Sequence, residues 1–490
     1  MAFVSKLERN KYFEKYEVTI PYANYSDTLD IETVIEQWES SYGTKHLGWA
    51  APYYLDMIRA HATLPRQDVQ AVLSELFYKI NHTFAEYRSE DCTGKYIYSL
   101  DTLVFVIMIA TIYGNTTAKS IVEFYREHFL ELYVIIPHLP DYTHKLSETT
   151  VSTAICCLNK ENVRRFFIEN FACIKAAIEG YLKETLAFDG QAINASYKKG
   201  ESNRKYKGSD ITTLFNCTRY RTVCYKHEAL KNHEKDAFVF NIEHYCNTFI
   251  EGTLIMCDAL NTKPIVTDII LKNGADYLMP VKANGNAEIL EHLTDVTSKP
   301  HDVFATHHDV TKDHGRIDER YIEILDPKKV LGKRMSFSHK HVRTIVKYTK
   351  HTQYVTAGVV NNETTTTRFY ISSLPLDENV LAQVVESISV YWNIEAHHAV
   401  LDAPELFNQD HLHACNTTTL ENHAGLNKIA HNFLSYMRDR LQAESTRPKS
   451  YTYTFKEALK FIQGLSVIDF LPYLADYWLD ELDKDIKENN

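Results

Sequence analysis

The spacing of apolar and polar residues predicts an all-α N-terminal region. Residues 1 to about 95 show helical spacing without a recognisable motif, and a further helix is expected at 118–130. The longest apolar stretch, Tyr96 to Tyr113, contains Asp101 and is shorter than the roughly 18 or more charge-poor residues that a membrane span needs. We therefore interpret this stretch as a buried helix.

Two short helices are expected next in the chain. Ser147 suits the N-cap of the first, and residues 159–162 interrupt the pattern before Val163 to Tyr181 continue it. Two helices joined by a tight turn are compatible with a helix-turn-helix DNA reader. The alternative is an ordinary helical hairpin packed on a core, which is favoured because the segment is not basic.

At Thr185 the pattern changes from helical to strand-like. Leu186 to Phe188 reads as a short apolar strand that ends in Asp189-Gly190. Further strands are expected at 212–218, 222–225, 253–257 and 277–281, and helices at 237–249 and 264–272. Strands in a run, followed by strands that alternate with helices, predict a mixed α/β sheet covered by helices. Residues 303–373 return to strand-like alternation, and 378–403 are expected to form one long helix.

Composition narrows the class of protein. A chain of 490 residues is expected to contain two or three structural units, and its 44% hydrophobic content is ample for their cores. No continuous apolar run opens the chain, and nine cysteines without a CxxC pair fit reduced thiols, so a cytoplasmic location is expected. The net charge of −11 argues against a nucleic-acid partner unless a basic surface is local.

Two aspartates, Asp189 and Asp258, each directly follow a short apolar strand. Side chains at such strand ends project into a crevice at the edge of a sheet. A single aspartate there is more often a turn former or a helix cap. The combination with Glu395, on a helix after a β-rich insertion, indicates a site made of three carboxylates.

Six segments carry a resemblance to a known family. They are Leu186-Ala-Phe-Asp-Gly190, Ile255-Met-Cys-Asp-Ala259, Gly274-Ala-Asp-Tyr-Leu-Met-Pro-Val-Lys-Ala-Asn-Gly-Asn286, His314-Gly-Arg-Ile-Asp-Glu-Arg320, Tyr370-Ile-Ser-Ser-Leu374 and Tyr391-Trp-Asn-Ile-Glu395. In this order they resemble the H-repeat-associated (ISAs-type) insertion-sequence transposases. The resemblance spans roughly 345 residues and leaves out the first 95 and the last 50.

The resemblance implies a ribonuclease H-like fold that cuts DNA by hydrolysis and strand transfer. Asp189, Asp258 and Glu395 would then be the catalytic residues and the metal ligands. Carboxylates suit Mg²⁺ or Mn²⁺, and two ions are expected, roughly 3.5 to 4 Å apart. The implied partners are the terminal inverted repeats and the target DNA. No membrane is involved, and the protein is expected to act as a homo-oligomer on DNA, associated with the nucleoid.

Basic residues near the aspartates and in the insertion are predicted to contact DNA. Residues 327–352 contain eight Lys and Arg side chains and no acidic one, which favours contact with the DNA backbone over a merely solvated surface. Asn284 also suits a turn with Gly285. The predicted contacts are Lys198, Lys199, Arg204, Lys205, Lys207, Lys282, Asn284, His314, Arg316, Lys328, Lys329, Lys333, Arg334, Lys340, Arg343 and Lys347.

The sequence departs from the family pattern where the family has cations. Gln191, Asn194 and Ser389 stand where Lys or Arg is usual. Two alternatives to an active transposase therefore stay open: a domesticated, catalytically weakened DNA-binding derivative, and a related nuclease of the same fold. His397 and His398 flank the glutamate, where they either tune the site or form a surface pair.

The predicted organisation has six parts. They are an N-terminal extension (1–95), a helical domain that is a candidate for DNA binding (96–181), the first part of the catalytic core (182–302), a basic β-rich insertion (303–375), the second part of the core with the glutamate helix (376–440) and a C-terminal helical tail (441–490).

Overall fold

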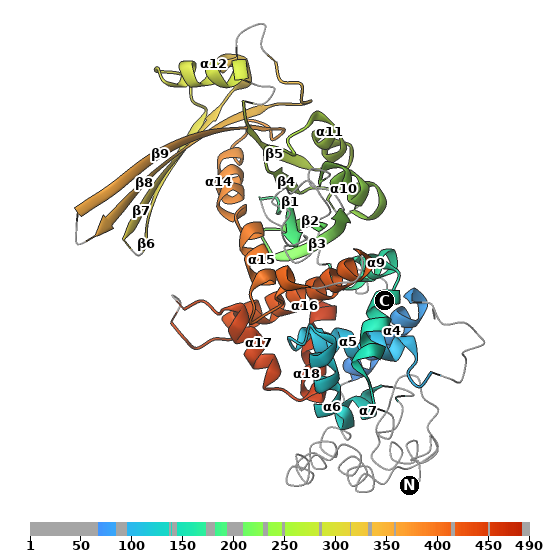
Figure 1. Ribbon diagram of the computed structural model, residues 1–490. Coiled ribbons are helices and arrows are strands. Elements are labelled where there is room, and N and C mark those ends of the chain that lie inside the picture. The colour runs from blue at the N-terminus through green and yellow to red at the C-terminus, as the bar shows by residue number, and fades with distance from the viewer. Residues whose placement is uncertain are drawn as a thin grey trace, which may run out of the picture. The chain divides into compact units, whose positions relative to one another are not determined.

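The computed structural model groups the chain into two compact units (Figure 1). One comprises residues 1–173, 194–196 and 400–490, and the other comprises 174–193 and 197–399. The residues that the structure describes are 67–84, 96–136, 139, 145–172, 182–193, 209–228, 234–246, 250–283, 287–313, 315–331, 336–356, 359–412, 417–448 and 451–482. Among the helices in these ranges, none combines the length and the apolar character that crossing a membrane requires.

The first unit is helical throughout its described part, and residues 1–66 lie outside that part. Its helices are α4 (Gln67–Thr83), α5 (Leu100–Ile112), α6 (Ala118–Glu127), α7 (Phe129–Ile135), α8 (Glu148–Cys157), α9 (Lys160–Asn170), the 3₁₀ turn η4 (Gln409–His411), α16 (Thr417–Ala443), α17 (Phe455–Gln463) and α18 (Val467–Leu482). Every residue of α5 except Asp101 is buried. A helix that is apolar all round belongs in a core, so the buried helix expected within 96–113 is confirmed.

Helix α16 carries buried polar side chains that satisfy the ends of other helices. Asn422 Nδ2 donates to the carbonyl oxygens of Ile155 (2.8 Å) and Leu158 (2.9 Å) at the end of α8. Asn432 Nδ2 donates to the Phe171 carbonyl, just after α9, at 2.9 Å. Carbonyls in the last turn of a helix have no partner within that helix. The C-terminal part of the chain therefore completes the helices of the N-terminal part.

Helix α9 begins three residues earlier than the sequence predicts. The side chain of Asn159 accepts hydrogen bonds from the backbone N–H groups of Glu161 (2.9 Å) and Asn162 (3.3 Å), so Asn159 is the N-cap and the helix starts at Lys160. The helix ends at Asn170, and residues 173–181 of the predicted helix lie outside the described residues. Local capping decided this boundary.

A buried ion pair joins α9 to α16. The guanidinium of Arg164 bonds the carboxylate of Glu421, and both side chains are fully buried. Lys160 Nζ lies 3.3 Å from the other oxygen of that carboxylate. Because α9 buries its central arginine against another helix, the packed hairpin is favoured over a DNA-reading helix-turn-helix.

The second unit is built on one nine-stranded sheet, in the order β3-β2-β1-β4-β5-β9-β8-β7-β6. The strands are β1 (Thr185–Ile193), β2 (Ser209–Asn216), β3 (Arg221–Glu228), β4 (Leu254–Cys257), β5 (Asp276–Val281), β6 (Ala305–Asp313), β7 (Arg316–Leu325), β8 (Thr344–Thr356) and β9 (Val359–Ser372). β4 is parallel to β1 and β5, whereas β2 is antiparallel to β1 and β3. This arrangement of the first five strands is ribonuclease H-like, so the predicted fold class is confirmed.

The four strands after β5 form the expected β-rich insertion, and β9 pairs with β5 to continue the core sheet. The hairpin between β6 and β7 turns at Gly315, whose φ of +79° suits glycine. A Cβ at this position would lie 2.6 Å from the Val355 carbonyl oxygen. The glycine next to His314 in the family segment therefore has a steric reason.

Helices cover both faces of the five-stranded part (Figure 1). They are α10 (Glu234–Asn241) with the π turn η3 (Ile242–Cys246), α11 (Pro264–Lys272), α14 (Val380–Val390) and α15 (Asn393–Asp402). Two more helices, α12 (Ala287–Thr297) and α13 (Pro327–Val330), accompany the insertion. On one face, the ring of Phe238 in α10 packs 4.7 Å from that of Phe188. On the other, Ile394 of α15 packs in a cluster with Ala187. Adjacent residues of β1 thus contact opposite helical layers.

Two predicted elements that carry the candidate carboxylates differ from the structure. β1 does not end at Asp189-Gly190, because its pairing with β2 continues to Ile193 after β4 has stopped. The single helix expected at 378–403 is interrupted at Tyr391 and Trp392, which separate α14 from α15. Long-range pairing extends the strand, and the backbone turns just before Glu395.

We expect the substitution Glu421→Ala to lower the free energy of unfolding by about 3 kcal/mol, because it leaves the buried Arg164 without its principal partner. The double variant Arg164→Met/Glu421→Leu should lose less, since it leaves no charge unpaired. Urea denaturation of the three proteins measures both effects. Glu123→Ala, in the exposed Lys119–Glu123 pair, is the control and should change stability by less than about 1 kcal/mol. Equal losses in Glu421→Ala and Glu123→Ala would refute the argument.

Candidate functional site

Asp189 and Asp258 occupy equivalent places on neighbouring parallel strands. Phe188 of β1 is in register with Cys257 of β4, and each aspartate is the next residue. Side chains alternate between the faces of a sheet, so Asp189 lies on the same face as Ala187. That face is the one covered by α15. The two aspartates therefore lie at the same level, where β4 ends and leaves an opening beside β1.

The turn after β4 fixes one oxygen of Asp258. Its Oδ1 accepts hydrogen bonds from the backbone N–H of Asn261 (2.9 Å) and from Asn261 Nδ2 (3.0 Å). Within the described residues, Oδ2 of Asp258 makes no hydrogen bond of its own. The carboxylate is thus oriented through one oxygen while the other is left available.

Glu395 lies in the first turn of α15. Two adjacent residues, Ile394 and Asn393, attach this end of the helix to the sheet. Ile394 is buried against Ala187, Phe215 and Cys217. Asn393 Nδ2 donates a hydrogen bond to the carbonyl oxygen of Cys217 at 2.9 Å. These contacts set the start of α15 on the sheet face that carries Asp189.

Glu395 and His398 share one face of α15, because they are three residues apart, and Tyr391 precedes them in the turn before the helix. His398 Nδ1 lies 3.8 Å from Asp189 Oδ2. Burial raises the pKa of Tyr391 well above its ordinary value, and the charges of Cys257, Asp189 and Asp258 raise it further. His398 and Tyr391, on either side of Glu395 in the sequence, thus both approach the aspartates.

The structure brings the three carboxylates to one region of one sheet face but does not gather their oxygens. In the part of the chain that the structure describes, no group of three His, Cys, Asp or Glu side chains is placed to hold a metal ion. Like-charged carboxylates repel, so their closer approach requires a counter-charge. The donor set fits Mg²⁺ or Mn²⁺ in kind, because these ions prefer carboxylate oxygens.

Glu395 is exposed, but its surroundings still shift the equilibrium between its charged and neutral forms. Partial burial raises the pKa of its carboxyl group, and the positive charge of Arg368 on β9 opposes this rise. Arg368 also lies over the ring of Trp392, 5.9 Å from its centre. Glu395 therefore lies within electrostatic reach of a basic, aromatic surface.

The two histidines next to Glu395 do not form a surface pair. His397 is fully buried, stacks on Phe215 with ring centres 4.5 Å apart, and has Nε2 3.4 Å from Thr222 Oγ1. The His398 side chain is 13% exposed, and Gln191 Nε2 donates to its carbonyl oxygen at 3.3 Å. His397 anchors α15 to the sheet, whereas His398 contacts Asp189.

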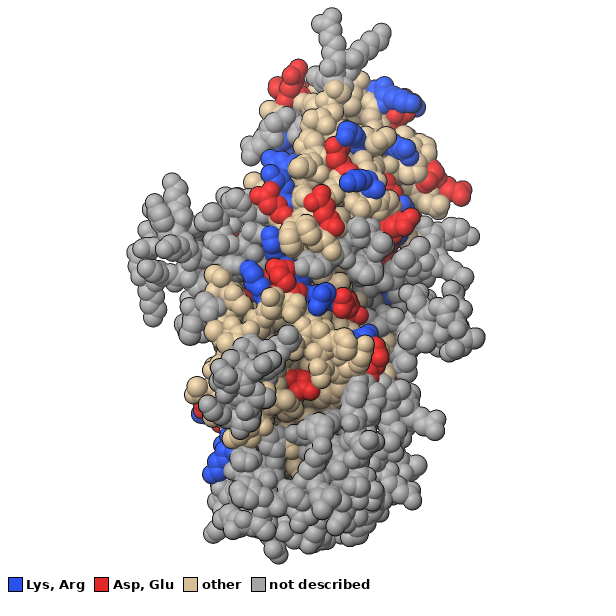
Figure 2. Space-filling model, turned by 90° about the vertical axis from the view of Figure 1, so that its right-hand side faces the viewer, with Lys and Arg blue, Asp and Glu red and all other residues tan. Residues whose placement is uncertain are grey.

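Many of the predicted DNA contacts lie outside the described residues. These are Lys198, Lys199, Arg204, Lys205, Lys207, Asn284, His314, Lys333 and Arg334. Lys282 is exposed directly after β5, and Lys328 and Arg343 are exposed in the insertion. On the face shown in Figure 2, basic and acidic side chains are interspersed.

Several cations of the acid-free run are paired with acids from elsewhere in the fold. Lys329 Nζ lies 3.5 Å from Asp302, and Lys340 Nζ lies 2.7 Å from Asp268. Lys347 is only 17% exposed, with Nζ 2.7 Å from Glu323, its cross-strand neighbour. It also donates to the Thr297 carbonyl at the end of α12, at 3.1 Å. Residues 327–352 contain no acidic residue, but the fold places acidic side chains from other segments beside several of their lysines.

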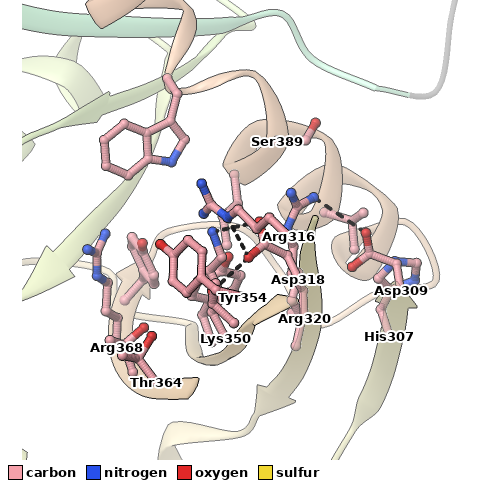
Figure 3. A pocket seen from close by; sticks show the side chains of 18 residues that line it. His307, Asp309, Arg316, Asp318, Arg320, Lys350, Tyr354, Thr364, Arg368 and Ser389 are labelled. Atoms are coloured by element: carbon pink, nitrogen blue, oxygen red, sulfur yellow. Dashed lines mark hydrogen bonds and ion pairs between the residues drawn. The ribbon is translucent and has the colours of Figure 1, made fainter. Parts of the chain in front are cut away.

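The insertion and α14 enclose a pocket of about 610 Å³ that the sequence did not indicate (Figure 3). Four cations and two carboxylates line it: Arg316, Arg320, Lys350 and Arg368, with Asp309 and Asp318. Of these, only Arg316 was among the predicted DNA contacts. Strand alternation explains the grouping, because residues 316, 318, 320 and 322 of β7 share one face.

Comparison with known proteins supports the family resemblance. No family model matches the chain. The chain is 23% identical over 354 residues to "H repeat-associated putative transposase YhhI" of Escherichia coli K12, which covers 70% of this chain and 86% of that protein. It is also 23% identical over 349 residues to "Putative protein YbfL" of the same organism, covering 69% and 85%. The resemblance read from the six segments is thus confirmed.

A solved structure is also similar to this chain. It is a cryo-EM structure of the piggyBac transposase synaptic complex with hairpin DNA, with 11% sequence identity and a TM-score of 0.35. The match covers 84% of this chain and 82% of that one.

The two histidines should respond differently to substitution. His397→Ala removes a buried ring that stacks on Phe215, so we expect a loss of about 2 to 4 kcal/mol in the free energy of unfolding. His398→Ala removes a side chain at the edge of the site and should cost less than about 1 kcal/mol. Urea denaturation followed by circular dichroism measures both. A His398 loss as large as the His397 loss would contradict the assigned roles.

Proposed function

We propose that this protein is a DNA transposase whose Asp189, Asp258 and Glu395 hold divalent metal ions and direct the cleavage and transfer of DNA strands. The observation that carries the proposal is the register of β1 with β4, which sets two carboxylates side by side beneath the helix of the third. The similarity to a protein named as a transposase supports the choice of substrate. DNA end sequences and an assembly of several copies would complete the reaction.

The three carboxylates come from two kinds of element, the sheet and a helix. Asp189 and Asp258 present their carboxylates from the sheet, and Glu395 presents its own from α15. Bound Mg²⁺ or Mn²⁺ supplies Lewis acidity, which activates an attacking oxygen and stabilises the leaving one. Asn261 orients Asp258 through Oδ1, and His398 lies against Asp189. The chain itself thus needs no covalent nucleophile.

Asp258→Asn tests the role of the carboxylate. The amide oxygen of asparagine can still accept the hydrogen bonds from Asn261, so the turn is expected to keep its shape while one ligand charge is lost. We expect DNA cleavage to fall by at least about a hundredfold, with DNA binding nearly unchanged. The assay is cleavage of DNA that carries the terminal inverted repeats flanking the gene, with Mg²⁺ or Mn²⁺ added.

Asp295→Asn is the matched control, since Asp295 is an exposed carboxylate on α12 and should leave cleavage unchanged. An Asp258→Asn protein that cuts at the wild-type rate would overturn the metal mechanism. A wild-type protein that binds the repeats but never cuts them would instead support a DNA-binding derivative.

The exposed basic side chains Lys328, Lys340 and Arg343 provide a second test. Changing all three to alanine should weaken binding to every DNA sequence, because phosphate contacts release counterions without reading bases. The slope of log affinity against log salt should become shallower by about one for each lost contact. Fluorescence anisotropy at several salt concentrations measures both quantities.

The control replaces Lys119, Lys456 and Lys460, three exposed lysines of the helical unit. The two triple variants carry the same change in net charge. If they weaken binding equally, the insertion has no special role in holding DNA.

A further inference from the structure

One edge of β9 is open along most of its length. β8 pairs with β9 from Val359 to Ser372, whereas β5 pairs only with residues 369–372. Among the strands that the structure describes, residues 359–368 therefore have a neighbour on one side alone, and all ten are exposed. Figure 1 shows β9 at the outer margin of the insertion. We call residues 359–368 the free edge of β9.

Two features limit the regular part of this free edge. The register between β8 and β9 shifts next to Tyr354 and skips Asn361. At the other end, Phe369 is already paired with Val281 of β5. In an edge strand, alternate backbone N–H and C=O groups point away from the single neighbour. Residues 362–368, between these limits, thus present a regular row of hydrogen-bond donors and acceptors.

The side chains of the free edge do not block the addition of a strand. Exposed edges are commonly protected by lysine, proline or inward-pointing charges. The free edge contains no lysine and no proline, and the four threonines 364–367 fill its centre. Threonine is a β-branched residue that favours strands. Glu363 and Arg368 are its only charged residues, so the free edge carries no net charge.

The charge of the free edge distinguishes a protein strand from DNA as its partner. Residues 359–367 contain no lysine or arginine, the side chains that neutralise phosphates. A row of backbone donors and acceptors instead fits an extended peptide, which adds to the sheet as a further strand. A second copy of the same segment meets no net charge, so electrostatic repulsion does not oppose self-association.

We propose that two copies of this chain associate by antiparallel pairing of residues 362–368 about a twofold axis at Thr365. This centre uses the whole regular stretch. Thr365 then faces Thr365 of the partner subunit, and Glu363 faces the partner's Thr367. Cross-strand threonine pairs are favourable, and no like charges face each other. A centre at Glu363 would instead set two carboxylates opposite each other and would extend past the register shift at Asn361.

Sedimentation velocity of the full-length protein without DNA, over a range of micromolar concentrations, tests the assembly. Wild type is expected to dimerise. Thr365→Glu should raise the dissociation constant of the dimer about tenfold or more, because two carboxylates then face each other close to Glu363 of each copy. Thr365→Gln has the same size without the charge and should dimerise as wild type does. Both variants lose the contact between Thr365 and His351 (2.9 Å), so they differ in charge alone.

Cross-linking locates the twofold axis. In an antiparallel pair, residues directly opposite each other have Cα atoms roughly 4.5 to 5.5 Å apart, a distance that a disulfide can bridge. Thr365→Cys should therefore form covalent dimers on mild oxidation. The two cysteines of Thr367→Cys would lie four residues apart along the strands, about 14 Å, and should not cross-link. Wild type gives the background from the native cysteines.

A monomeric wild type would overturn the proposal. So would a Thr365→Glu protein that dimerises as tightly as Thr365→Gln, or equal cross-linking through residues 365 and 367. The proposal goes beyond the proposed function, because none of these measurements involves the three carboxylates or DNA. A dimer that never cuts DNA would fail only the proposed function, and a monomer that cuts it would fail only this proposal.

Discussion

The antiparallel pairing of β5 with β9 is the contact on which the second unit depends. Val281 is in register with Phe369, and Leu278 with Ser372, so the core and the insertion form one sheet. Ser372 Oγ donates to the Tyr277 carbonyl oxygen at 2.6 Å at the end of this seam. Because β9 ends there, α14 follows at once and covers the face that carries Asp189. β9 therefore carries Arg368 to the pocket. Its end also fixes where α14 begins, and α14 is followed by α15 with Glu395.

Local signals predicted the elements whose ends depend on nearby residues. Helix α11 has the predicted bounds, because Pro264 begins it and Gly274, at a φ of +75°, follows its end. The extension of β1 and the break before α15 were missed for the opposite reason. They depend on pairing with β2 and on the bond from Asn393 to Cys217, and no local pattern reports such distant contacts. In the same way, no local pattern in the sequence predicts that α16 packs among the other helices of the first unit.

The site was predictable in part. Strand ends and the family segments indicated where Asp189, Asp258 and Glu395 lie, and the sheet register explains why the two aspartates are neighbours. The pocket was missed, although one signal for it was available. Lys347 and Lys350 are three residues apart on a strand, so they must point to opposite faces. Counting both in one basic run hid the fact that one supports α12 and the other lines the pocket. The acids that pair with them come from β7, which the sequence run does not include.

Strand β6 is an outer edge of the nine-stranded sheet and is paired only with β7 among the described strands. Such an edge presents backbone donors and acceptors to which a strand from another copy can add. β6 counters this with its composition, since His307, His308, Asp309, Lys312 and Asp313 leave Val310 as its one exposed large apolar side chain. Another strand added there would bring charged groups together at the cost of their hydration. The polar character of β6 thus protects the protein from aggregation at high concentration, a demand separate from folding and from catalysis.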